Sequence, residues 1–333
     1  STLIVGPSWV GDMVMAQSLF KVLKASDPDR AFDVLAPDWS LPIVARMPEI
    51  RNGIASETGH GEIGLAKRRR IASTLRDSGY DQAIVLPRSF KSALIPWLAG
   101  IPKRIGYRGE SRFLLINDVR PFDRGVLDQT VKRFVALGLG RDEALPASLP
   151  YPALSVSPDN QARVLQTLGL DTRRPVIAMM PGAEYGPAKC WPLEYFAELA
   201  TRLEQAGYAI WVLGSEKDRP AGEVIAASSE AVNLCGRTTL EDVIDLLAAC
   251  EQAVSNDSGL MHIAAAVSIH VHGIYGSSSP KFTPPLTKSR DIHEIGLDCS
   301  PCYERECPLG HTRCLNDLFP AKILSKILKR RTK

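Results

Sequence analysis

The sequence predicts an α/β protein with two doubly wound domains. Short β-rich runs alternate with helical segments in the first half of the chain, and the alternation begins again in the second half. This alternation favours a parallel sheet in each half. The chain has 333 residues, which exceeds the usual single-domain size of ~100–200 residues. A stretch rich in Gly, Pro, Ala and Ser separates the halves, so we expect domains over residues 1–150 and 151–333.

In the first half, a glycine-containing loop follows the first expected strand and leads into a helix. Strands are expected over residues 2–5, 32–36 and 82–86, and helices over residues 13–25 and 63–78. The loop places Asp12 at the carboxyl end of the sheet, where open α/β proteins hold their chemistry. Asp12 could instead only favour the helix dipole, and position alone favours this simpler role. The glycines do not match G-x-G-x-x-G, so a dinucleotide fingerprint is not indicated.

A basic and partly aromatic tract over residues 87–120 is the second feature of this half. It contains Arg88, Lys91, Lys103, Arg104, Tyr107, Arg108 and Arg112. A solvated surface explains any one of these residues, but their density suggests loops that line a cationic cleft. Together with the run Lys67-Arg68-Arg69-Arg70, the tract could face an acidic acceptor or an anionic membrane surface.

The second half repeats the strand–helix alternation without an obvious repeat of the first half's sequence. Strands are expected over residues 175–180, 209–213, 252–255 and 271–275, and helices over residues 191–206, 239–249 and 262–267. Thr239 is a suitable N-cap for the middle helix.

Two loops of the second half are suited to binding an anion. Residues 255–259 read Ser-Asn-Asp-Ser-Gly, a turn that aims backbone N–H groups and the positive end of a helix dipole at one point. Residues 181–192 contain two glycines for close backbone approach and Lys189 as a point charge for a phosphate. The first loop alone is equally well explained as an ordinary capped turn, but the two together could converge on a diphosphate. Residues 214–218 end a third strand and could offer carboxylates to ribose hydroxyls.

Composition and charge exclude several classes of protein. With 40 basic and 37 acidic residues, the net charge of +3 does not suggest a nucleic-acid binder. No apolar run reaches the ~18 residues of a membrane span, and the first residues lack the layout of a signal peptide. Three scattered cysteines fit a reducing compartment, so a cytoplasmic protein is expected.

Four further cysteines lie close together near the C-terminus: Cys299, Cys302, Cys307 and Cys314. This density suits a structural zinc site or an iron–sulfur cluster. The spacings are not those of a standard zinc finger, so closely spaced cysteines without a metal are the alternative.

Several long segments, in order along nearly the whole chain, resemble the ADP-heptose:lipopolysaccharide heptosyltransferases. Residues 6–13 (GPSWVGDM) are similar to that family's opening loop, and residues 89–94, 99–102 and 106–110 to its acceptor-side segments. Residues 181–189 (PGAEYGPAK) and 256–262 (NDSGLMH) are similar to its donor-side loops, and residues 275–280 and 282–285 also fit. The resemblance is strongest for the branch that adds the second heptose.

This resemblance implies the GT-B fold, in which two Rossmann-like domains face each other across a cleft. The C-terminal domain would bind ADP-L-glycero-D-manno-heptose. The N-terminal domain would bind heptosyl-Kdo2-lipid A, an inner core that already carries its first heptose. The helix expected over residues 322–331 would pack back on the N-terminal domain. Because the acceptor is anchored in a bilayer, we expect peripheral contact between the basic N-terminal face and the inner face of the inner membrane.

The resemblance also implies roles for individual residues. Asp12 would be the general base of an inverting transfer, and Lys189 would stabilise the charge on the departing ADP. His262 would lie near the phosphates, with a capped or core histidine as the alternative, and Arg88 departs from the Asn that the family pattern leads us to expect. The other donor-side residues are Gly182, Ala183, Glu216, Asp218, Thr238, Asp257, Ser258 and Gly259, and the acceptor-side residues are Ser89, Lys91 and Arg108.

The chemistry implied by this family needs no cofactor. ADP binding is expected without Mg²⁺, although Mg²⁺ could stimulate the reaction. A related transferase with another nucleotide sugar or another core acceptor would share most of these features. A non-catalytic nucleotide-sugar-binding protein would share the donor loops but would need no base at Asp12.

Overall fold

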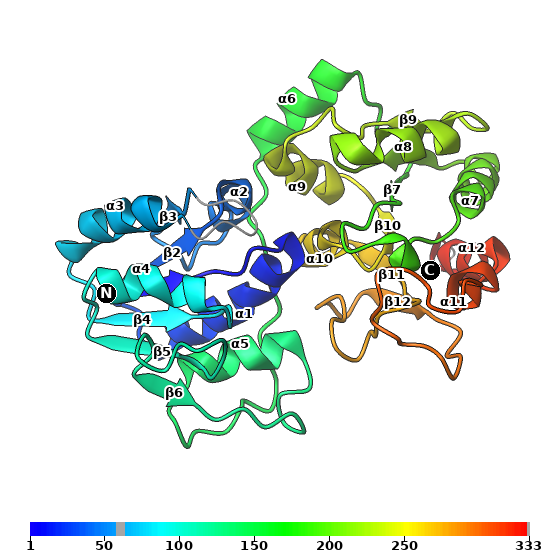
Figure 1. The fold of residues 1–333 in the computed structure, drawn as a ribbon. Helices are drawn as coiled ribbons and strands as arrows, with labels where there is room; N and C mark the ends of the chain where they lie inside the picture. The colour runs from blue at the N-terminus through cyan, green and yellow to red at the C-terminus, as the bar shows by residue number, and fades with distance from the viewer. Residues whose placement is uncertain (58–63, 332–333) are drawn as a thin grey trace. The chain divides into compact units, whose positions relative to one another are not determined.

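The chain folds into two compact units, Ser1–Pro152 and Ala153–Lys333. Figure 1 shows the computed structural model, which describes residues 1–57 and 64–331. Each unit is built around one six-stranded parallel sheet. The predicted α/β class with two doubly wound sheets is therefore confirmed.

The strands of the N-terminal sheet run in the order β3-β2-β1-β4-β5-β6. They are β1 (Thr2–Val5), β2 (Phe32–Ala36), β3 (Asn52–Ala55), β4 (Gln82–Val85), β5 (Lys103–Tyr107) and β6 (Asp118–Arg120). The three strands predicted from the sequence are β1, β2 and β4, which form the buried centre of the sheet. The other strands lie toward the edges and begin with exposed or half-exposed residues, so their apolar pattern is weaker.

Helices and short 3₁₀ turns connect these strands. They are α1 (Val10–Ser26), η1 (Asp38–Ser40), α2 (Leu41–Val44), α3 (Leu65–Arg76), η2 (Phe90–Ala93), α4 (Leu94–Leu98) and α5 (Thr130–Gly138). Helix α1 packs on α5, and α3 packs on α4 (Figure 1). The predicted helix over residues 63–78 corresponds to α3, and its first residue lies outside the described part of the chain.

The C-terminal sheet has the same topology as the N-terminal sheet. Its order is β12-β11-β10-β7-β8-β9, so both sheets read 3-2-1-4-5-6 when strands are counted from the start of each unit. The strands are β7 (Val176–Met180), β8 (Ala209–Val212), β9 (Val232–Asn233), β10 (Gln252–Asn256), β11 (His270–Ile274) and β12 (Arg290–His293). The four strands predicted here are again the central ones, β7, β8, β10 and β11.

The helices of the C-terminal unit surround this sheet. They are α6 (Pro158–Leu168), η3 (Pro187–Lys189), α7 (Leu193–Gln205), η4 (Glu216–Asp218), α8 (Arg219–Ala226), α9 (Leu240–Ala248), α10 (Gly259–Ala266), α11 (Arg313–Asn316) and α12 (Pro320–Arg331). Helix α12 packs on α7 and buries Ile323 and Ile327 in the core of its own unit. Contact of this helix with the N-terminal domain stays a prediction. Among the described residues, no helix combines the length and apolarity of a membrane span.

The shared strand order gives each sheet one topological switch point. It lies between β1 and β4 in the N-terminal unit and between β7 and β10 in the C-terminal unit. Open parallel sheets bind ligands at such points, outside the carboxyl ends of the strands. The fold therefore directs attention to the loops after β1, β4, β7 and β10.

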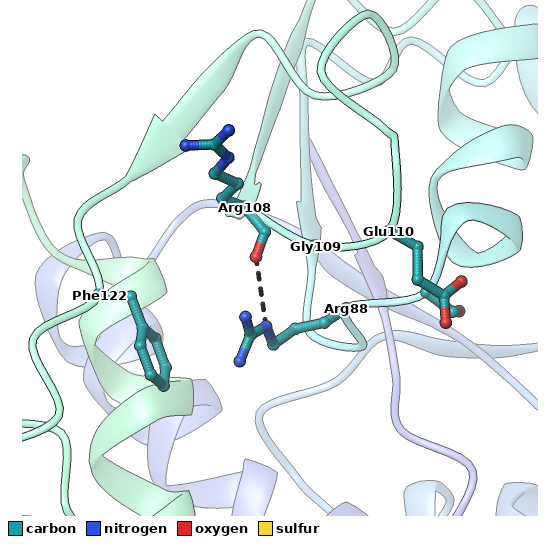
Figure 2. A pocket seen from close by; sticks show the side chains of 6 residues that line it. Arg88, Arg108, Gly109, Glu110 and Phe122 are labelled. Carbon is teal, nitrogen blue, oxygen red and sulfur yellow. Dashed lines mark hydrogen bonds between the residues drawn. The ribbon is translucent and has the colours of Figure 1, made fainter.

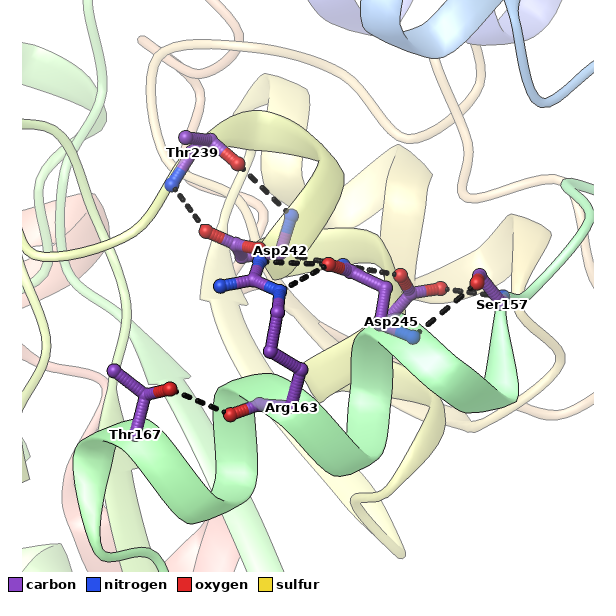
Figure 3. Close-up of polar contacts among 7 residues, drawn as sticks. Ser157, Arg163, Thr167, Thr239, Asp242 and Asp245 are labelled. Atoms are coloured by element: carbon purple, nitrogen blue, oxygen red, sulfur yellow. Dashed lines mark hydrogen bonds and ion pairs between the residues drawn. The ribbon is translucent and has the colours of Figure 1, made fainter.

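A polar cluster fastens α6 to α9 (Figure 3). Asp245 is fully buried, and its carboxylate accepts a hydrogen bond of 2.7 Å from the Asn160 amide. Asp242 accepts one of 2.8 Å from Arg163 and forms a capping box with Thr239, which confirms the predicted N-cap. Burial opposes ionisation of Asp242, but hydrogen bonds from Thr239 and Asn160 lower its pKa overall.

Three histidines form a buried row on β11 and β12. His272 Nε2 lies 2.9 Å from the Gln252 amide oxygen, and His272 Nδ1 lies 3.1 Å from His293 Nε2. Because an amide oxygen only accepts, His272 carries its proton on Nε2 and accepts from His293 on Nδ1. His270 Nε2 lies 2.9 Å from the Asp291 carboxylate. Donor atoms of His270, His272 and Asp291 lie within 4.8 Å of one another, as in a metal site, but neutral rings already satisfy this row.

The stability of the fold should fall as the pH drops below about 6.5. Burial lowers the pKa of His272 to about 2 and that of His293 to about 4, assisted by neighbouring positive groups that include Lys326. Both rings then stay neutral in the folded chain while they bind protons in the unfolded chain. Stability that is present above the unfolded pKa is therefore lost below it, by about 1.4 kcal/mol per ring at one unit below.

Denaturant unfolding at pH 7.5 and pH 5.5 measures this loss. His272→Gln should make the loss smaller, because one depressed pKa has been removed. His311→Gln changes a half-buried histidine outside the row and should leave the loss unchanged. An equal loss in all three proteins would contradict the assignment.

Candidate functional site

The loops after β7 and β10 converge at the switch point of the C-terminal sheet. Lys189 Nζ, in η3, lies 2.6 Å from Oδ2 of Asp257, which directly follows β10. Their side chains are only 18% and 5% exposed. The convergence predicted from the sequence is confirmed, and it places a preformed ion pair in a site with little solvent.

One buried side chain fixes this loop pair. Asn256, the last residue of β10, donates from Nδ2 to the Pro181 carbonyl at 2.6 Å and accepts at Oδ1 from Trp191 N at 3.1 Å. It therefore ties both ends of the loop over residues 181–191, named here the Lys189 loop, to the sheet. The sequence shows Asn256 only as a polar residue in a turn, so this role could not be predicted from it.

Helix α10 begins at the same point. Its N-cap is Ser258, in an extended conformation, and the Ser258 side chain makes no capping hydrogen bond. The first-turn N–H groups at Gly259 and beyond thus keep the donor capacity and partial positive charge of a helix start. Together with Lys189, they form an anion-binding arrangement at the end of β10.

Several buried polar atoms lack a hydrogen-bond partner, and one of them, on His262, belongs to α10 itself. Among the described residues they include His262 Nδ1, Thr238 Oγ1, Ser277 Oγ and Ser278 Oγ. Burial lowers the pKa of His262 to about 4, with the Asp257 charge opposing and the Lys189 charge assisting, so the ring is neutral at neutral pH. Native structures satisfy nearly all buried polar groups, so these four atoms are candidates for contact with a polar ligand.

The loop after β8 packs closely on the loop after β7. A Cβ added to Gly182 would meet Asp218 Oδ1 at 2.3 Å, so a larger residue here would displace the Asp218 side chain. Asp218 Oδ2 accepts hydrogen bonds of 2.8 Å from both the backbone and the hydroxyl of Ser215, which closes the turn. Glu216 is exposed and pairs with Arg219. Ribose binding by Glu216 or Asp218, and donor contact by half-buried Ala183, stay predictions.

The cysteine-rich segment supports the Lys189 loop. Lys189 Nζ and the Arg305 guanidinium both lie over the Tyr185 ring, at 5.1 and 5.3 Å from its centroid. The Tyr185 hydroxyl donates to the Tyr303 carbonyl at 2.6 Å, and Ala188 N donates to the Arg305 carbonyl at 3.0 Å. The sequence places these segments more than a hundred residues apart and gave no signal for this contact.

The four clustered cysteines lie close enough to interact: besides burial, the charges of Cys302, Cys307 and Cys299 raise the pKa of the Cys314 thiol. All are free thiols. A tetrahedral zinc site would bring its sulfur atoms to about 3.8 Å from one another. Among the described residues, no three of these thiols lie within 4.8 Å of each other; the only group of three such donors is the one on β11 and β12. Zinc or an iron–sulfur cluster at these cysteines therefore stays a prediction, and the same segment also contacts the Lys189 loop.

Asp12 lies at the switch point of the N-terminal sheet. It is half-buried in the first turn of α1, which follows the carboxyl end of β1. The Trp39 indole donates to the Ser8 carbonyl at 2.9 Å and so helps to hold this loop. Both interpretations of Asp12 from the sequence fit this position, because a carboxylate there favours the helix dipole and also faces the ligand-binding edge.

A cavity of about 670 Å³ opens beside the ends of β4 and β5 (Figure 2). Its lining is Arg88, Ser89, Arg108, Gly109, Glu110 and Phe122. The Arg88 guanidinium lies 4.8 Å from the Phe122 ring centroid, and Arg88 Nε donates to the Arg108 carbonyl at 3.3 Å. Predicted acceptor residues Ser89 and Arg108 therefore share one cavity, whereas Lys91 lies on η2 and is not among the described lining residues.

Other arginines of the basic tract are structural. Arg112 is 2% exposed and donates to the carbonyls of Pro87 at 2.6 Å and Tyr107 at 2.8 Å. Arg104 donates to the Leu115 carbonyl at 2.7 Å. The predicted cationic cleft is thus correct for Arg88 and Arg108 but wrong for these two residues, whose long side chains satisfy backbone groups of irregular loops.

Arg112→Met should destabilise the protein, whereas Arg108→Met should not. The first change leaves buried carbonyls without a donor and should cost about 2–4 kcal/mol of unfolding free energy. Arg108 is exposed and lines the cavity, so its loss should affect only ligand binding there. Denaturant unfolding of both variants measures the difference, and equal losses would contradict this division of roles.

These features point to a fold class. Two Rossmann-like sheets, each with polar loops at its switch point, are the arrangement found in GT-B glycosyltransferases. A family profile described as glycosyltransferase family 9 (heptosyltransferase) matches residues 68–313.

Full-length relatives agree with this match. The chain is 43% identical to lipopolysaccharide heptosyltransferase 2 of Salmonella typhimurium and 41% identical to that of Escherichia coli, with 98% of this chain and 97% of each relative covered. The solved structure of E. coli ADP-heptose lps heptosyltransferase II is 40% identical, with a TM-score of 0.89 over 99% of this chain and 98% of that one. The structure of E. coli heptosyltransferase WaaC with ADP, at 20% identity over 98% and 99% of the two chains, has a TM-score of 0.75 and shares the fold. The chain belongs to glycosyltransferase family 9.

Proposed function

We propose that this chain transfers L-glycero-D-manno-heptose from ADP-heptose to the first heptose of the lipopolysaccharide inner core, as heptosyltransferase 2 does. The observation that carries this proposal is the Lys189–Asp257 pair at the start of α10. It joins a cation and helix N–H groups, which suit a diphosphate, to a carboxylate, which suits sugar hydroxyls.

The donor occupies the C-terminal switch point in this proposal. Lys189 and the N–H groups at Ser258 and Gly259 hold the diphosphate, and Asp257 accepts hydrogen bonds from heptose hydroxyls. As the anomeric bond breaks, negative charge grows on the leaving ADP. Donors that are already aimed at that charge stabilise the transition state without reorganisation. Neutral His262 adds a polar contact near the phosphates.

Asp12 acts as the general base. It removes the proton from the acceptor hydroxyl while that oxygen attacks the anomeric carbon opposite the ADP. Attack from that side inverts the anomeric centre. The Asp12 carboxylate lies in the first turn of α1, where the helix dipole favours a negative group.

The acceptor, heptosyl-Kdo2-lipid A, binds the N-terminal domain. Arg88 and Arg108 both line one cavity, and guanidinium groups suit the carboxylates and phosphates of an inner core. Ser89 offers a hydroxyl there, and Lys91 adds charge from the neighbouring η2. The proposal puts the enzyme in the cytoplasm, and a lipid-anchored acceptor supports peripheral contact with the inner-membrane surface.

Metal ions have no part in the proposed transfer. The one Asp-x-Asp in the chain, Asp27-Pro28-Asp29, lies in the turn before β2, at the edge of the sheet away from the switch-point loops. We expect ADP to bind in EDTA without Mg²⁺, and Mg²⁺ to raise its affinity only modestly through the diphosphate. Titration calorimetry in the two buffers checks this expectation, and binding that is lost in EDTA would contradict it.

Two other candidates make different predictions for one experiment. A transferase with another nucleotide sugar would use that donor better than ADP-heptose, and a non-catalytic binding protein would use neither. Purified protein is mixed with a one-heptose core acceptor and either ADP-heptose or other ADP-sugars, and products are weighed by mass spectrometry. A mass increase of one heptose only with ADP-heptose supports the proposal, and preference for another donor overturns it.

A further inference from the structure

One layer of the N-terminal unit combines exposed apolar side chains with a basic helix. It consists of α3, η2, α4 and the loop over residues 108–117, and is named here the α3–α4 layer. Its inner side chains, which include Ile71, Ile95 and Ile116, belong to one core cluster with the central strands. Helices α3 and α4 lie side by side in this layer (Figure 1).

Buried or half-buried arginines fasten the parts of this layer to one another. Arg112 Nη1 lies 3.1 Å from Ser92 Oγ on η2, in addition to its bonds to backbone carbonyls. Arg68 of α3 donates to the Lys91 carbonyl on η2 at 3.0 Å, and Arg104 of β5 holds the far end of the loop at Leu115. The loop that follows Arg112 is therefore held at both ends by backbone-binding guanidinium groups.

Large apolar side chains project from this fastened layer. Leu114 is 81% exposed and Phe113 is 68% exposed, the two highest values among the large apolar residues that the structure describes. Trp97 of α4 and Phe90 of η2 are 45% and 42% exposed. Soluble proteins rarely leave adjacent large apolar residues so accessible without a partner for them.

The charge on the same layer favours an anionic partner. Helix α3 contains Lys67, Arg69, Arg70 and Arg76 besides the buried Arg68, and it has no acidic residue. Its first residue, Leu65, is itself 42% exposed. Of the acidic residues near this layer, Glu57 pairs with Arg70, Glu110 accepts from Phe90 N, and exposed Asp77 follows the last residue of α3. Basic residues beside exposed Leu, Phe and Trp are the composition of surfaces that lie in a lipid interface.

We propose that the α3–α4 layer is a membrane-docking face, in which Phe113 and Leu114 enter the interface of an anionic bilayer and the α3 cations bind its headgroups. The inference rests on the proposed function in one respect, namely that the acceptor is lipid-linked. Two residues that line the acceptor cavity lie close in sequence to these apolar residues. Ser89 directly precedes Phe90, and Glu110 lies three residues before Phe113. A docked layer therefore brings the cavity close to the sugars of a lipid held in the same bilayer.

Sedimentation with vesicles tests this face without any transfer assay. The purified chain should bind vesicles that contain phosphatidylglycerol, bind phosphatidylcholine vesicles at least tenfold less, and be released by high salt. Phe113→Ser/Leu114→Ser should lower affinity for the anionic vesicles at least tenfold. Val224→Ser/Leu309→Ser, which removes two exposed apolar residues of the C-terminal unit, should not change it.

Three results would overturn the proposal. They are no binding of the wild-type chain to anionic vesicles, unchanged binding of the Phe113→Ser/Leu114→Ser variant, and a concentration-dependent dimer that this variant abolishes. The last would assign the face to a second copy of the chain.

Activity separates this proposal from the proposed function. With a delipidated, water-soluble acceptor the double variant should match the wild type, and with the acceptor embedded in anionic vesicles it should be at least tenfold slower. Loss of activity on both acceptors would indicate damage to the cavity and would count against a docking role. Vesicle binding by a chain that transfers no heptose to any acceptor would leave the docking face standing and refute the proposed function.

Discussion

Replacing Asp12 by Asn is expected to lower kcat by about 10²–10⁴-fold, the usual contribution of a positioned general base. Asparagine keeps the shape of the side chain in the first turn of α1 but cannot take up the proton of the acceptor hydroxyl. Affinity for ADP should not change, because the donor residues lie in the C-terminal unit. Steady-state kinetics and titration calorimetry on the same preparation give both quantities.

Asp38→Asn is the matched control for this change. Asp38 is exposed in the first turn of η1, which follows the neighbouring strand β2, so it loses the same charge at the same edge of the sheet. Its kcat should stay within a few-fold of wild type. Full turnover in the Asp12 variant, or equal loss in both variants, would refute the general-base assignment.

Replacing Lys189 by Met is expected to lower kcat by about 10²–10³-fold, the scale measured for removal of one donor to developing negative charge. The change also leaves Asp257 largely buried without its 2.6 Å partner, so ADP-heptose affinity should fall as well. Kinetics with the donor varied separate the two effects.

The pair Lys217–Glu184 provides the control. These residues come from neighbouring loops at the same edge of the sheet, but their side chains are 78% and 58% exposed. Exposed pairs contribute little, so Lys217→Met should have only a small effect. A double-mutant cycle of Lys189→Met and Asp257→Asn should give a coupling energy of about 0.5–3 kcal/mol. Additive effects would contradict a shared site.

The centre of each sheet could be predicted from the sequence, and the edges could not. β7 reads as an apolar run because both of its faces are buried in a parallel sheet. β3, β5 and β6 are short or partly exposed, so propensity alone does not distinguish them from loops. The equal strand order of the two units was also not visible, because the same topology is built here from unrelated sequences.

For the site, the sequence identified loops but not the contacts between distant side chains. The turn residues around Asp257 and the glycines around Lys189 report local backbone needs, so the two anion loops could be identified. Asn256 and Arg305 act through contacts with distant segments, and no local pattern reveals such contacts. The sequence suggested that Arg112 binds an anion. It could not show that the Arg112 guanidinium donates its hydrogen bonds to backbone carbonyls.

The central claim is heptosyl transfer onto a core that already carries one heptose. The most direct measurement supplies purified protein with ADP-heptose and core acceptors that bear zero or one heptose, and follows ADP release and product mass. We predict a mass increase of one heptose on the one-heptose acceptor and none on the heptose-free acceptor. Transfer to the heptose-free acceptor, or to neither while ADP still binds, would contradict the assignment of the acceptor.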